Sequence, residues 1–245
     1  MKKHRQLIVF SVVIIEIALS GCISVQAKRE PVAGTSPPEA LLWYRSSAEM
    51  KAIYEQTYRA ATEYVRSAAP GRAPRTWGVI MDADETILNN SEYQARLYRA
   101  GARFKEDTWD AWVKERRATP LPGAKNFIDT VHLLGGQVIV VTNRAESQCA
   151  ATTENLSKVG IPVDRALCAP QGISDKNPRF DSIRNGDARS GAQPIDVIAF
   201  VGDNIQDFPR RTQQQPGDLR DFGRTEFILP NPLYGSWSKN PLPNP

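Results

Sequence analysis

The chain has little histidine and little cysteine, with two of the first and three of the second in 245 residues. His132 is the only histidine beyond the fourth position. A Ser-His-Asp triad, a histidine-phosphatase mechanism or a His-based zinc site would therefore rest on that one residue. It lies in a helical pattern, where we expect a structural role. Neither Cys149 nor Cys168 has an arginine six positions later, which excludes the loop of the cysteine phosphatases.

A strong charge of one sign is also missing, because the formal net charge is only +4. Such a mild excess does not argue for binding a nucleic-acid polymer. It would attract an anionic small molecule only if it were focused in a cleft. With 41% hydrophobic and 24% charged residues, the composition excludes disorder and collagen and fits one globular domain or a core domain with a smaller cap.

The apolar run at the N-terminus is short. Residues 7–19 form an apolar stretch of 13 residues that contains Glu16, whereas a helix that spans a bilayer takes about 20 apolar residues. Basic residues precede this run, and the order is typical of a signal peptide, which we place at residues 1–21. A transmembrane anchor is the less favoured alternative.

The run closes in Leu19-Ser20-Gly21-Cys22, which resembles the lipobox of bacterial lipoproteins. The resemblance implies that Cys22 is acylated and becomes the new N-terminus, followed by a tether of residues 22–38 that is rich in turn formers. We therefore expect a lipid-anchored protein of the cell envelope, and Ile23 after the cysteine favours the outer membrane. An ordinary cleavage site beside an unmodified cysteine is the alternative.

Two further cysteines, Cys149 and Cys168, lie 19 positions apart. If Cys22 is acylated, they remain as thiols in an oxidising compartment. A disulfide between them would then contribute about 3 kcal/mol in the loop-entropy model. Two free, buried thiols are the alternative, and the sequence leaves both arrangements open.

Short apolar segments alternate with helical patterns along the chain. The apolar segments predict buried strands at residues 77–81, 137–141 and 196–201. Apolar spacing predicts helices at 39–68, 124–134 and 146–159, the first being one or two helices with Tyr54, Tyr58, Ala61 and Val65 on the packed face. The alternation predicts an α/β fold, a Rossmann-like parallel sheet flanked by helices.

A segment at about residues 89–120, between the first strand and the next helix, is rich in aromatic and charged residues. We expect it to form a small helical cap over the site. The tail after Leu229 contains five prolines, which predicts an irregular segment on the surface. Residues 39–245 are therefore assigned to one domain that contains the cap as an insert.

Each predicted strand ends in polar residues, and open parallel sheets bind ligands at the carboxyl ends of their strands. The three ends read Asp82-Ala83-Asp84-Glu85-Thr86, Thr142-Asn143-Arg144 and Gly202-Asp203-Asn204-Ile205-Gln206-Asp207. Residues i and i+2 of an extended segment point the same way, so Asp82 and Asp84 should both face the crevice. With Asp203 and Asp207, four carboxylates would share a small volume. Their repulsion predicts a bound cation, for which Mg²⁺ is best suited.

These motifs together resemble the haloacid dehalogenase superfamily, which has D-x-D-x-T after one apolar strand, Thr or Ser after a second, a lysine, and G-D-x-x-x-D after a third. The four-aspartate form behind a lipoprotein leader is similar to the bacterial class C acid phosphatases. The segments Ile87 to Gln94 and Pro230 to Trp237 add to this similarity. The resemblance covers roughly residues 40 to 238 and implies hydrolysis of phosphate monoesters, including nucleoside 5′-monophosphates.

The resemblance also implies a role for each site residue. Asp82 is the nucleophile that forms an aspartyl-phosphate, and Asp84 is the general acid and then the base. Thr142 and Asn143 hold phosphate oxygens, while Lys176 neutralises charge on the transferring group. Mg²⁺ is held by Asp82, Asp84 through its main-chain carbonyl, and Asp203, with support from Asp207. An acid pH optimum follows, because Asp84 needs its proton when the leaving group departs.

Several alternatives stay open at this point. Arg144 and Arg179 either contact phosphate or lie on the surface. The aromatic residues that would stack on a nucleotide base also fit core packing; they are Tyr93, Trp109, Trp112 and Tyr234. A non-catalytic lipoprotein that binds nucleotides or a cation is the alternative function, and a phosphotransferase is a third. The sequence does not fix the oligomeric state, and a homodimer is kept as an option.

Overall fold

The computed structural model describes residues 36–186 and 191–242. The predicted signal peptide, the lipobox Cys22 and most of the predicted tether lie outside the described residues. In the part of the chain that is described, no helix is both long and apolar enough to cross a membrane.

A five-stranded parallel sheet forms the centre of the fold, with strand order β5-β4-β1-β6-β7. Its strands are β1 (Trp77–Met81), β4 (Gln137–Ala145), β5 (Arg165–Ala169), β6 (Asp196–Gly202) and β7 (Glu226–Ile228). The three predicted strands are confirmed as β1, β4 and β6, which are neighbours in the middle of the sheet. All five residues of β1 are buried, as expected for a central strand covered on both faces.

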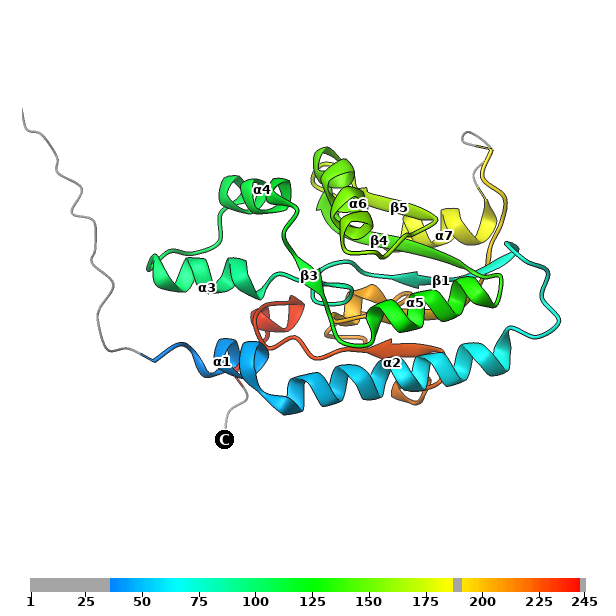
Figure 1. Ribbon diagram of the computed structural model, residues 1–245, viewed down its shortest axis with the longest axis horizontal. Coiled ribbons are helices and arrows are strands. Elements are labelled where there is room, and N and C mark those ends of the chain that lie inside the picture. The colour runs from blue at the N-terminus through cyan, green and yellow to red at the C-terminus, as the bar shows by residue number, and fades with distance from the viewer. Residues whose placement is uncertain (1–35, 187–190, 243–245) are drawn as a thin grey trace, which may run out of the picture.

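Helices cover both faces of the sheet (Figure 1). They are α2 (Ala48–Ala68), α5 (Ala124–Leu133), α6 (Cys149–Lys158) and α7 (Asn177–Asn185), whereas α1 (Glu39–Ser46) packs against α2 and the cap helix that begins at Ser91. Alternate residues of β1 enter two separate cores: Val79 and Met81 pack with the helices α2, α5 and α6, and Ile80 packs with α7. The predicted α/β fold, a Rossmann-like parallel sheet flanked by helices, is therefore confirmed.

The N-terminal helical region is two helices, because the chain bends at Ser47. The side chain of Ser47 accepts a hydrogen bond from the backbone N–H of Met50 at 3.0 Å and so caps the start of α2. The predicted face of Tyr54, Tyr58, Ala61 and Val65 is fully buried. Core packing is thus the confirmed role of this tyrosine stripe.

The cap is an insert between β1 and α5. It contains β2 (Leu88–Asn89), α3 (Ser91–Arg99), α4 (Glu106–Glu115) and β3 (Thr119–Pro120). β2 and β3 pair antiparallel, Leu88 with Pro120 and Asn89 with Thr119, and so join the two ends of the insert. In Figure 1, α3 and α4 extend beyond the carboxyl ends of β1 and β4.

Short 3₁₀ helices complete the fold: η1 (Glu146–Gln148), η2 (Ile205–Asp207), η3 (Leu219–Asp221) and η4 (Ser236–Lys239). After β7 the tail is irregular apart from η4, as its prolines predict. The backbone N–H of Leu229 donates to the carbonyl of Gly202 at 2.8 Å, so the tail starts beside the end of β6.

Candidate active site

The polar segments that follow β1, β4 and β6 meet at one edge of the sheet and open into a pocket of about 810 Å³. Strand ends and the α7 region line its floor with Asp82, Asp84, Asn143, Arg144, Lys176, Asp203 and Asp207. The cap, α1 and the tail form the remaining walls, which include Leu41, Leu97, Phe104, Trp109, Leu233 and Tyr234. The pocket therefore joins a charged floor to largely apolar walls.

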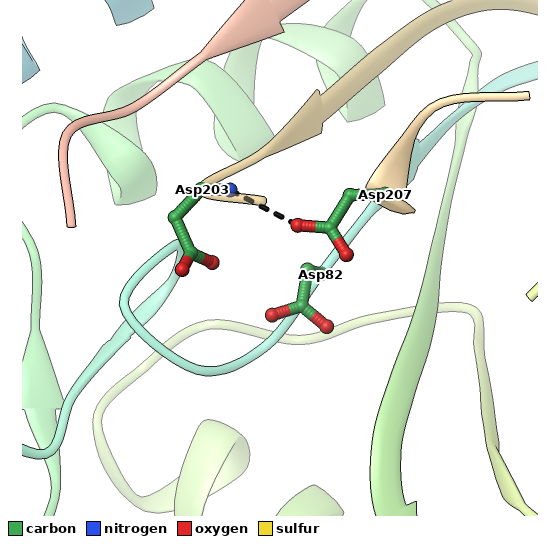
Figure 2. Close-up of side chains that lie close together, drawn as sticks. All are labelled: Asp82, Asp203 and Asp207. Atoms are coloured by element: carbon green, nitrogen blue, oxygen red, sulfur yellow. Dashed lines mark hydrogen bonds between the residues drawn. The ribbon is translucent and has the colours of Figure 1, made fainter. Parts of the chain in front are cut away.

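Three carboxylates gather on this floor. Oxygen atoms of Asp82, Asp203 and Asp207 all lie within 4.8 Å of one another (Figure 2). Asp207 is fixed by the turn after β6, because its Oδ2 accepts the backbone N–H groups of Asp203 at 3.1 Å and Asn204 at 2.8 Å. A Cβ at Gly202 would collide with the Asp207 side chain, which explains the glycine of this motif.

One lysine faces this acidic cluster. Lys176 is 3% exposed, and its Nζ donates to Asp82 Oδ1 at 2.5 Å and to Asp207 Oδ1 at 2.7 Å. Burial acts to lower the pKa of Lys176, but the carboxylates of Asp207 and Asp82 outweigh it and raise that pKa. Lys176 therefore lies buried at the floor of the pocket, and its contact with phosphate stays a prediction.

The cluster places three carboxyl groups beside the one ammonium group of Lys176. Burial raises the pKa of Asp82 to about 7, with Lys176 opposing the shift and the charges of Asp207 and Asp84 adding to it. Burial also raises the pKa of Asp203, and Asp207 and Asp82 add to it. Three carboxylates that each offer an oxygen are suitable ligands for a hard divalent cation such as Mg²⁺. The residues present therefore suit the predicted metal.

The side chain of Asp84 is separate from this cluster. The sequence predicted four carboxylates in one small volume, and the structure brings three of them together. Asp84 instead lies against Arg144, whose Nη2 donates to its Oδ1 at 2.6 Å. The chain bends at Ala83, between the two aspartates, so the carboxylate of Asp84 lies apart from the cluster although it lines the same pocket. A metal contact through the Asp84 main-chain carbonyl stays a prediction.

The residues after β4 differ in their access to the pocket. Thr142 is fully buried, and its Oγ1 accepts the backbone N–H of Arg144 at 3.2 Å. Asn143 lines the pocket, and its Oδ1 accepts from Arg179 Nη2 at 2.7 Å. Contacts of Thr142 and Asn143 with phosphate stay predictions. Arg144 and Arg179 are both buried, so the alternative that they lie on the surface is wrong.

The sequence did not predict a role for several other polar residues at the site. Asn231 in the tail donates from Nδ2 to Asp203 Oδ2 at 2.8 Å, and Thr86 Oγ1 donates to Asp203 Oδ1 at 3.0 Å. Glu85 is fully buried. Its carboxylate accepts the backbone N–H of Asn90 at 2.7 Å and the hydroxyl of Tyr234. Asn90 and Asn231 lie in the two segments whose similarity to the class C acid phosphatases is noted above, and that similarity is the sequence feature that could have pointed to them.

The burial of Glu85 perturbs its titration. Burial raises the pKa of this carboxyl to about 8, and the charge of Asp84 adds to the shift, while hydrogen bonds from Asn90 oppose it. Tyr234 reaches Glu85 from the tail, which therefore packs against the turn after β1.

The four aromatic candidates for base stacking divide into two pairs. Trp109 and Tyr234 line the pocket, whereas Tyr93 and Trp112 are buried in the core. Tyr93 packs against Trp109 and Trp112, with ring centroids 5.3 and 6.4 Å away. The alternative of core packing is therefore confirmed for Tyr93 and Trp112.

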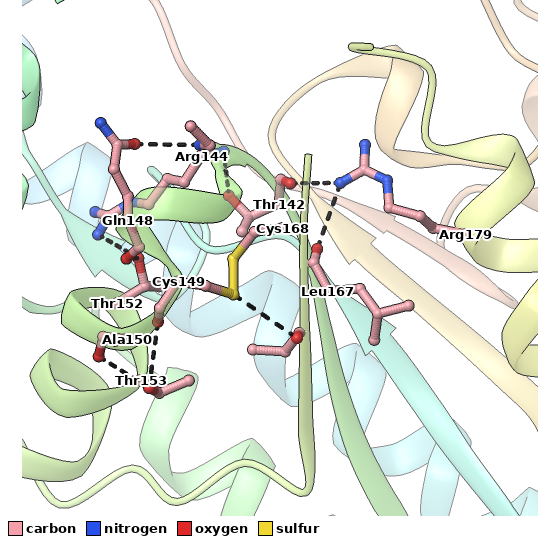
Figure 3. The surroundings of a disulfide bond; sticks show 12 residues. Thr142, Arg144, Gln148, Cys149, Ala150, Thr152, Thr153, Leu167, Cys168 and Arg179 are labelled. Carbon is pink, nitrogen blue, oxygen red and sulfur yellow. Dashed lines mark hydrogen bonds between the residues drawn. A yellow bond between two sulfur atoms is a disulfide. The ribbon is translucent and has the colours of Figure 1, made fainter. Parts of the chain in front are cut away.

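A disulfide lies at the same edge of the sheet. Cys149 at the start of α6 is bonded to Cys168 in β5, which settles the alternatives left by the sequence (Figure 3). The bond ties α6 to the outer strand, next to the buried Arg144 and Arg179. His132 lies away from this site and contacts Asp164 Oδ2 at 2.9 Å, while the same oxygen accepts the backbone N–H of Val138. Its predicted structural role is confirmed.

Two plant proteins are similar to this chain in sequence. Acid phosphatase 1 from Solanum lycopersicum is 34% identical over 178 residues, which cover 71% of this chain and 64% of the relative. Vegetative storage protein 1 from Arabidopsis thaliana is 27% identical over 158 residues, which cover 63% of this chain and 54% of the relative. The match thus spans less than two thirds of the length of either relative.

Solved structures extend the similarity to the fold. The class C acid phosphatase from Bacillus anthracis superimposes with a TM-score of 0.71 and 29% identity, covering 81% of this chain and 85% of that chain. The same enzyme with tungstate bound gives a TM-score of 0.68 over the same coverage. The family described as HAD superfamily, subfamily IIIB (Acid phosphatase), matches residues 26–237. The chain therefore belongs to the subfamily IIIB acid phosphatases of the haloacid dehalogenase superfamily.

Proposed function

We propose that this chain is a Mg²⁺-dependent acid phosphatase that hydrolyses small phosphate monoesters through an aspartyl-phosphate on Asp82. The observation that carries the proposal is the carboxylate cluster of Asp82, Asp203 and Asp207, in which Asp82 and Asp207 bond to Lys176 on the floor of an open pocket. Tungstate is a tetrahedral oxyanion, and its presence in the Bacillus relative supports a site for phosphate in this family.

Asp82 and Lys176 prepare the first half of the reaction. Lys176 neutralises negative charge beside the nucleophile and holds its carboxylate in place. A carboxylate oxygen of Asp82 attacks phosphorus, and the bond from phosphorus to the ester oxygen breaks. Asp82, Asp203 and the Asp84 main chain would hold Mg²⁺, which supplies positive charge to the phosphoryl oxygens when bound. The proton of Asp84 passes to the departing alkoxide, which leaves as the alcohol.

Asp84 acts again in the second half. Its carboxylate removes a proton from water, the water oxygen attacks phosphorus, and the bond to Asp82 breaks to release inorganic phosphate. The net reaction consumes one ester and one water and regenerates both aspartates. Phosphoryl transfer depends mainly on positioning and charge, which these residue types provide.

The apolar walls favour an organic leaving group with an aromatic part. Trp109 and Tyr234 line the pocket together with Phe104 and Leu97, and flat rings stack well on such side chains. We therefore extend the proposal to nucleoside 5′-monophosphates. A substrate panel tests this, since equal kcat/KM for nucleotides and glycerol phosphate would contradict it.

Phosphate release from p-nitrophenyl phosphate, with and without EDTA, tests the central claim. We expect release that EDTA abolishes and added Mg²⁺ restores. No metal-dependent release would instead favour a non-catalytic binder of nucleotides or cations. The acceptor also matters, because transfer to added alcohols in preference to water would favour a phosphotransferase.

The anchor is a separate part of the proposal. We propose that Cys22 is acylated and holds the phosphatase on the cell envelope, since it follows a leader with the lipobox pattern. Palmitate labelling of the expressed protein and its presence in the membrane fraction should both be lost in Cys22→Ser. A Cys22→Ser variant that still takes up label would contradict acylation at this residue.

A further inference from the structure

Arg144 is buried at the charged floor but contacts the acid rather than the nucleophile. It lies near the end of β4 and is 2% exposed. Its Nε donates to both carboxylate oxygens of Asp84, at 3.0 and 3.1 Å, and its Nη2 donates to Asp84 Oδ1 at 2.6 Å. This planar contact fixes the orientation of the carboxylate as well as its position, because the guanidinium fork matches carboxylate geometry.

Arg144 is itself held from three directions. Its Nη1 donates to Thr152 Oγ1 on α6 at 3.1 Å, and its Nη2 donates to Asn90 Oδ1 at 3.3 Å. The guanidinium also lies over the ring of Trp109 in the cap, 5.4 Å from the ring centre. A long side chain with these contacts has little rotamer freedom left.

Asn90 completes the arrangement. Its Nδ2 donates to Asp84 Oδ1 at 2.8 Å, and its Oδ1 accepts the indole N–H of Trp112 in α4 at 2.8 Å. Oδ1 of Asp84 thus accepts from both Arg144 and Asn90. Oδ2 accepts only from Arg144 Nε among the described residues. Oδ2 is therefore the oxygen with room for a proton, and the side chain of Asp84 lines the pocket.

We propose that Arg144 is the positioning residue for the general acid. It holds Asp84 so that Oδ2 presents its proton to the leaving oxygen, and through Trp109 and Asn90 it makes that orientation depend on the cap. This inference rests on the proposed function, in which Asp84 protonates the departing alkoxide. Arg144 does not transfer a proton itself and acts through Asp84 alone.

The dependence on the leaving group tests this role. A nitrophenolate departs without a proton, whereas the alkoxide of glycerol phosphate needs one. kcat/KM reports the steps up to formation of the phospho-enzyme, where this proton moves. We expect Arg144→Ala to lower kcat/KM for glycerol phosphate about 10²-fold, within the range of general acid catalysis. For p-nitrophenyl phosphate the loss of kcat/KM should stay under about tenfold. Asp84→Asn should show the same difference between the two substrates.

Further variants keep the test decisive if Arg144→Ala folds poorly. Arg144→Lys keeps a buried cation but lacks the fork, so it should show the same selectivity with a smaller loss. Added methylguanidinium should restore turnover of glycerol phosphate by Arg144→Ala. Arg220→Ala is the control. This exposed arginine of η3 pairs with Asp218 at the start of that helix, so its loss should leave kcat/KM for both substrates unchanged.

Two outcomes overturn the inference in different ways. Equal losses on both substrates in the arginine variants, with Asp84→Asn selective for glycerol phosphate, would make Arg144 a structural residue and leave the proposed function intact. An Asp84→Asn variant without any selectivity would remove the general acid from the proposed function, and the role of Arg144 would fall with it.

Discussion

The two charged parts of the pocket floor are balanced in different ways. The nucleophile wall, defined as Asp82, Asp203, Asp207 and Lys176, has three carboxylates for one cation. The acid wall, defined as Asp84, Asn90 and Arg144, has one carboxylate for one guanidinium. The first therefore has more acidic than basic side chains and suits a further cation, whereas the second has one acidic and one basic side chain.

The supports of the two walls differ as well. The backbone after β1 and β6 places the nucleophile wall, and the turn of Asp203 and Asn204 holds Asp207. Side chains of the cap and of α6 place the acid wall, through Trp112, Trp109 and Thr152. A cation should therefore control the first wall and the packing of the cap the second, and the changes below separate the two.

The largest effect is expected from Asp82→Asn. An amide oxygen is a poor nucleophile and cannot form the acyl-phosphate, so kcat for p-nitrophenyl phosphate should fall at least about 10⁴-fold. Phosphate release under saturating Mg²⁺ measures this. Asp84→Asn is the comparison from the acid wall, and it should retain much more kcat/KM on this substrate, because the nitrophenolate leaves without a proton. Turnover that survives Asp82→Asn would exclude the aspartyl-phosphate route.

Removing the disulfide should have the next largest effect, on stability. The double variant Cys149→Ser/Cys168→Ser frees α6 from β5, and the loop-entropy model predicts a loss of about 3 kcal/mol. For a chain of this size the melting temperature should fall by about 6–12 °C. Calorimetry measures the melting temperature. A reductant should lower the melting temperature of the wild type but not that of the double variant. A wild type that does not respond to reductant would contradict the estimate.

The sequence predicted the parts of the fold that consist of contiguous apolar residues. β1, β4 and β6 are such segments, and their buried centres follow from their composition. β5 and β7 were missed for physical reasons. β5 begins with the partly exposed Arg165, and β7 has three residues of which Ile228 is exposed. Strands at the edges of a sheet do not need a continuous apolar sequence.

The site shows the same limit. Asp82, Asp203 and Asp207 were predicted because strand ends in a parallel sheet meet at one edge, whereas Lys176 was assigned through the family resemblance alone. The structure brings all four together. The separation of Asp84 was not predictable from spacing, since it depends on the bend at Ala83 and on Arg144, 60 positions away. The contact of Asn231 with Asp203 likewise depends on where the tail returns.

A smaller effect on the nucleophile wall is expected from Thr86→Val. This nearly isosteric change removes the hydroxyl that donates to Asp203 Oδ1. Loss of such a supporting contact should raise the Mg²⁺ concentration for half-maximal activity about tenfold, with kcat recovered at saturation. Metal titrations with p-nitrophenyl phosphate measure the shift. Asn231→Ala should act in the same direction, and a change in leaving-group selectivity would contradict the separation of the walls.

The smallest effect is expected from Trp112→Phe in the cap, and it bears only on the acid wall. The change removes the indole N–H that Asn90 Oδ1 accepts, so Asn90 and Arg144 hold Asp84 less firmly. One hydrogen bond of this kind contributes about 1 kcal/mol, and kcat/KM for glycerol phosphate should fall a few-fold while that for p-nitrophenyl phosphate stays level. Trp77→Phe is the matched control, because the Trp77 Nε1 is buried without a hydrogen-bond partner among the described residues. Both variants lose the same volume and some stability, so selectivity that changes in both would show that loosened packing, and not the contact with Asn90, governs the acid wall.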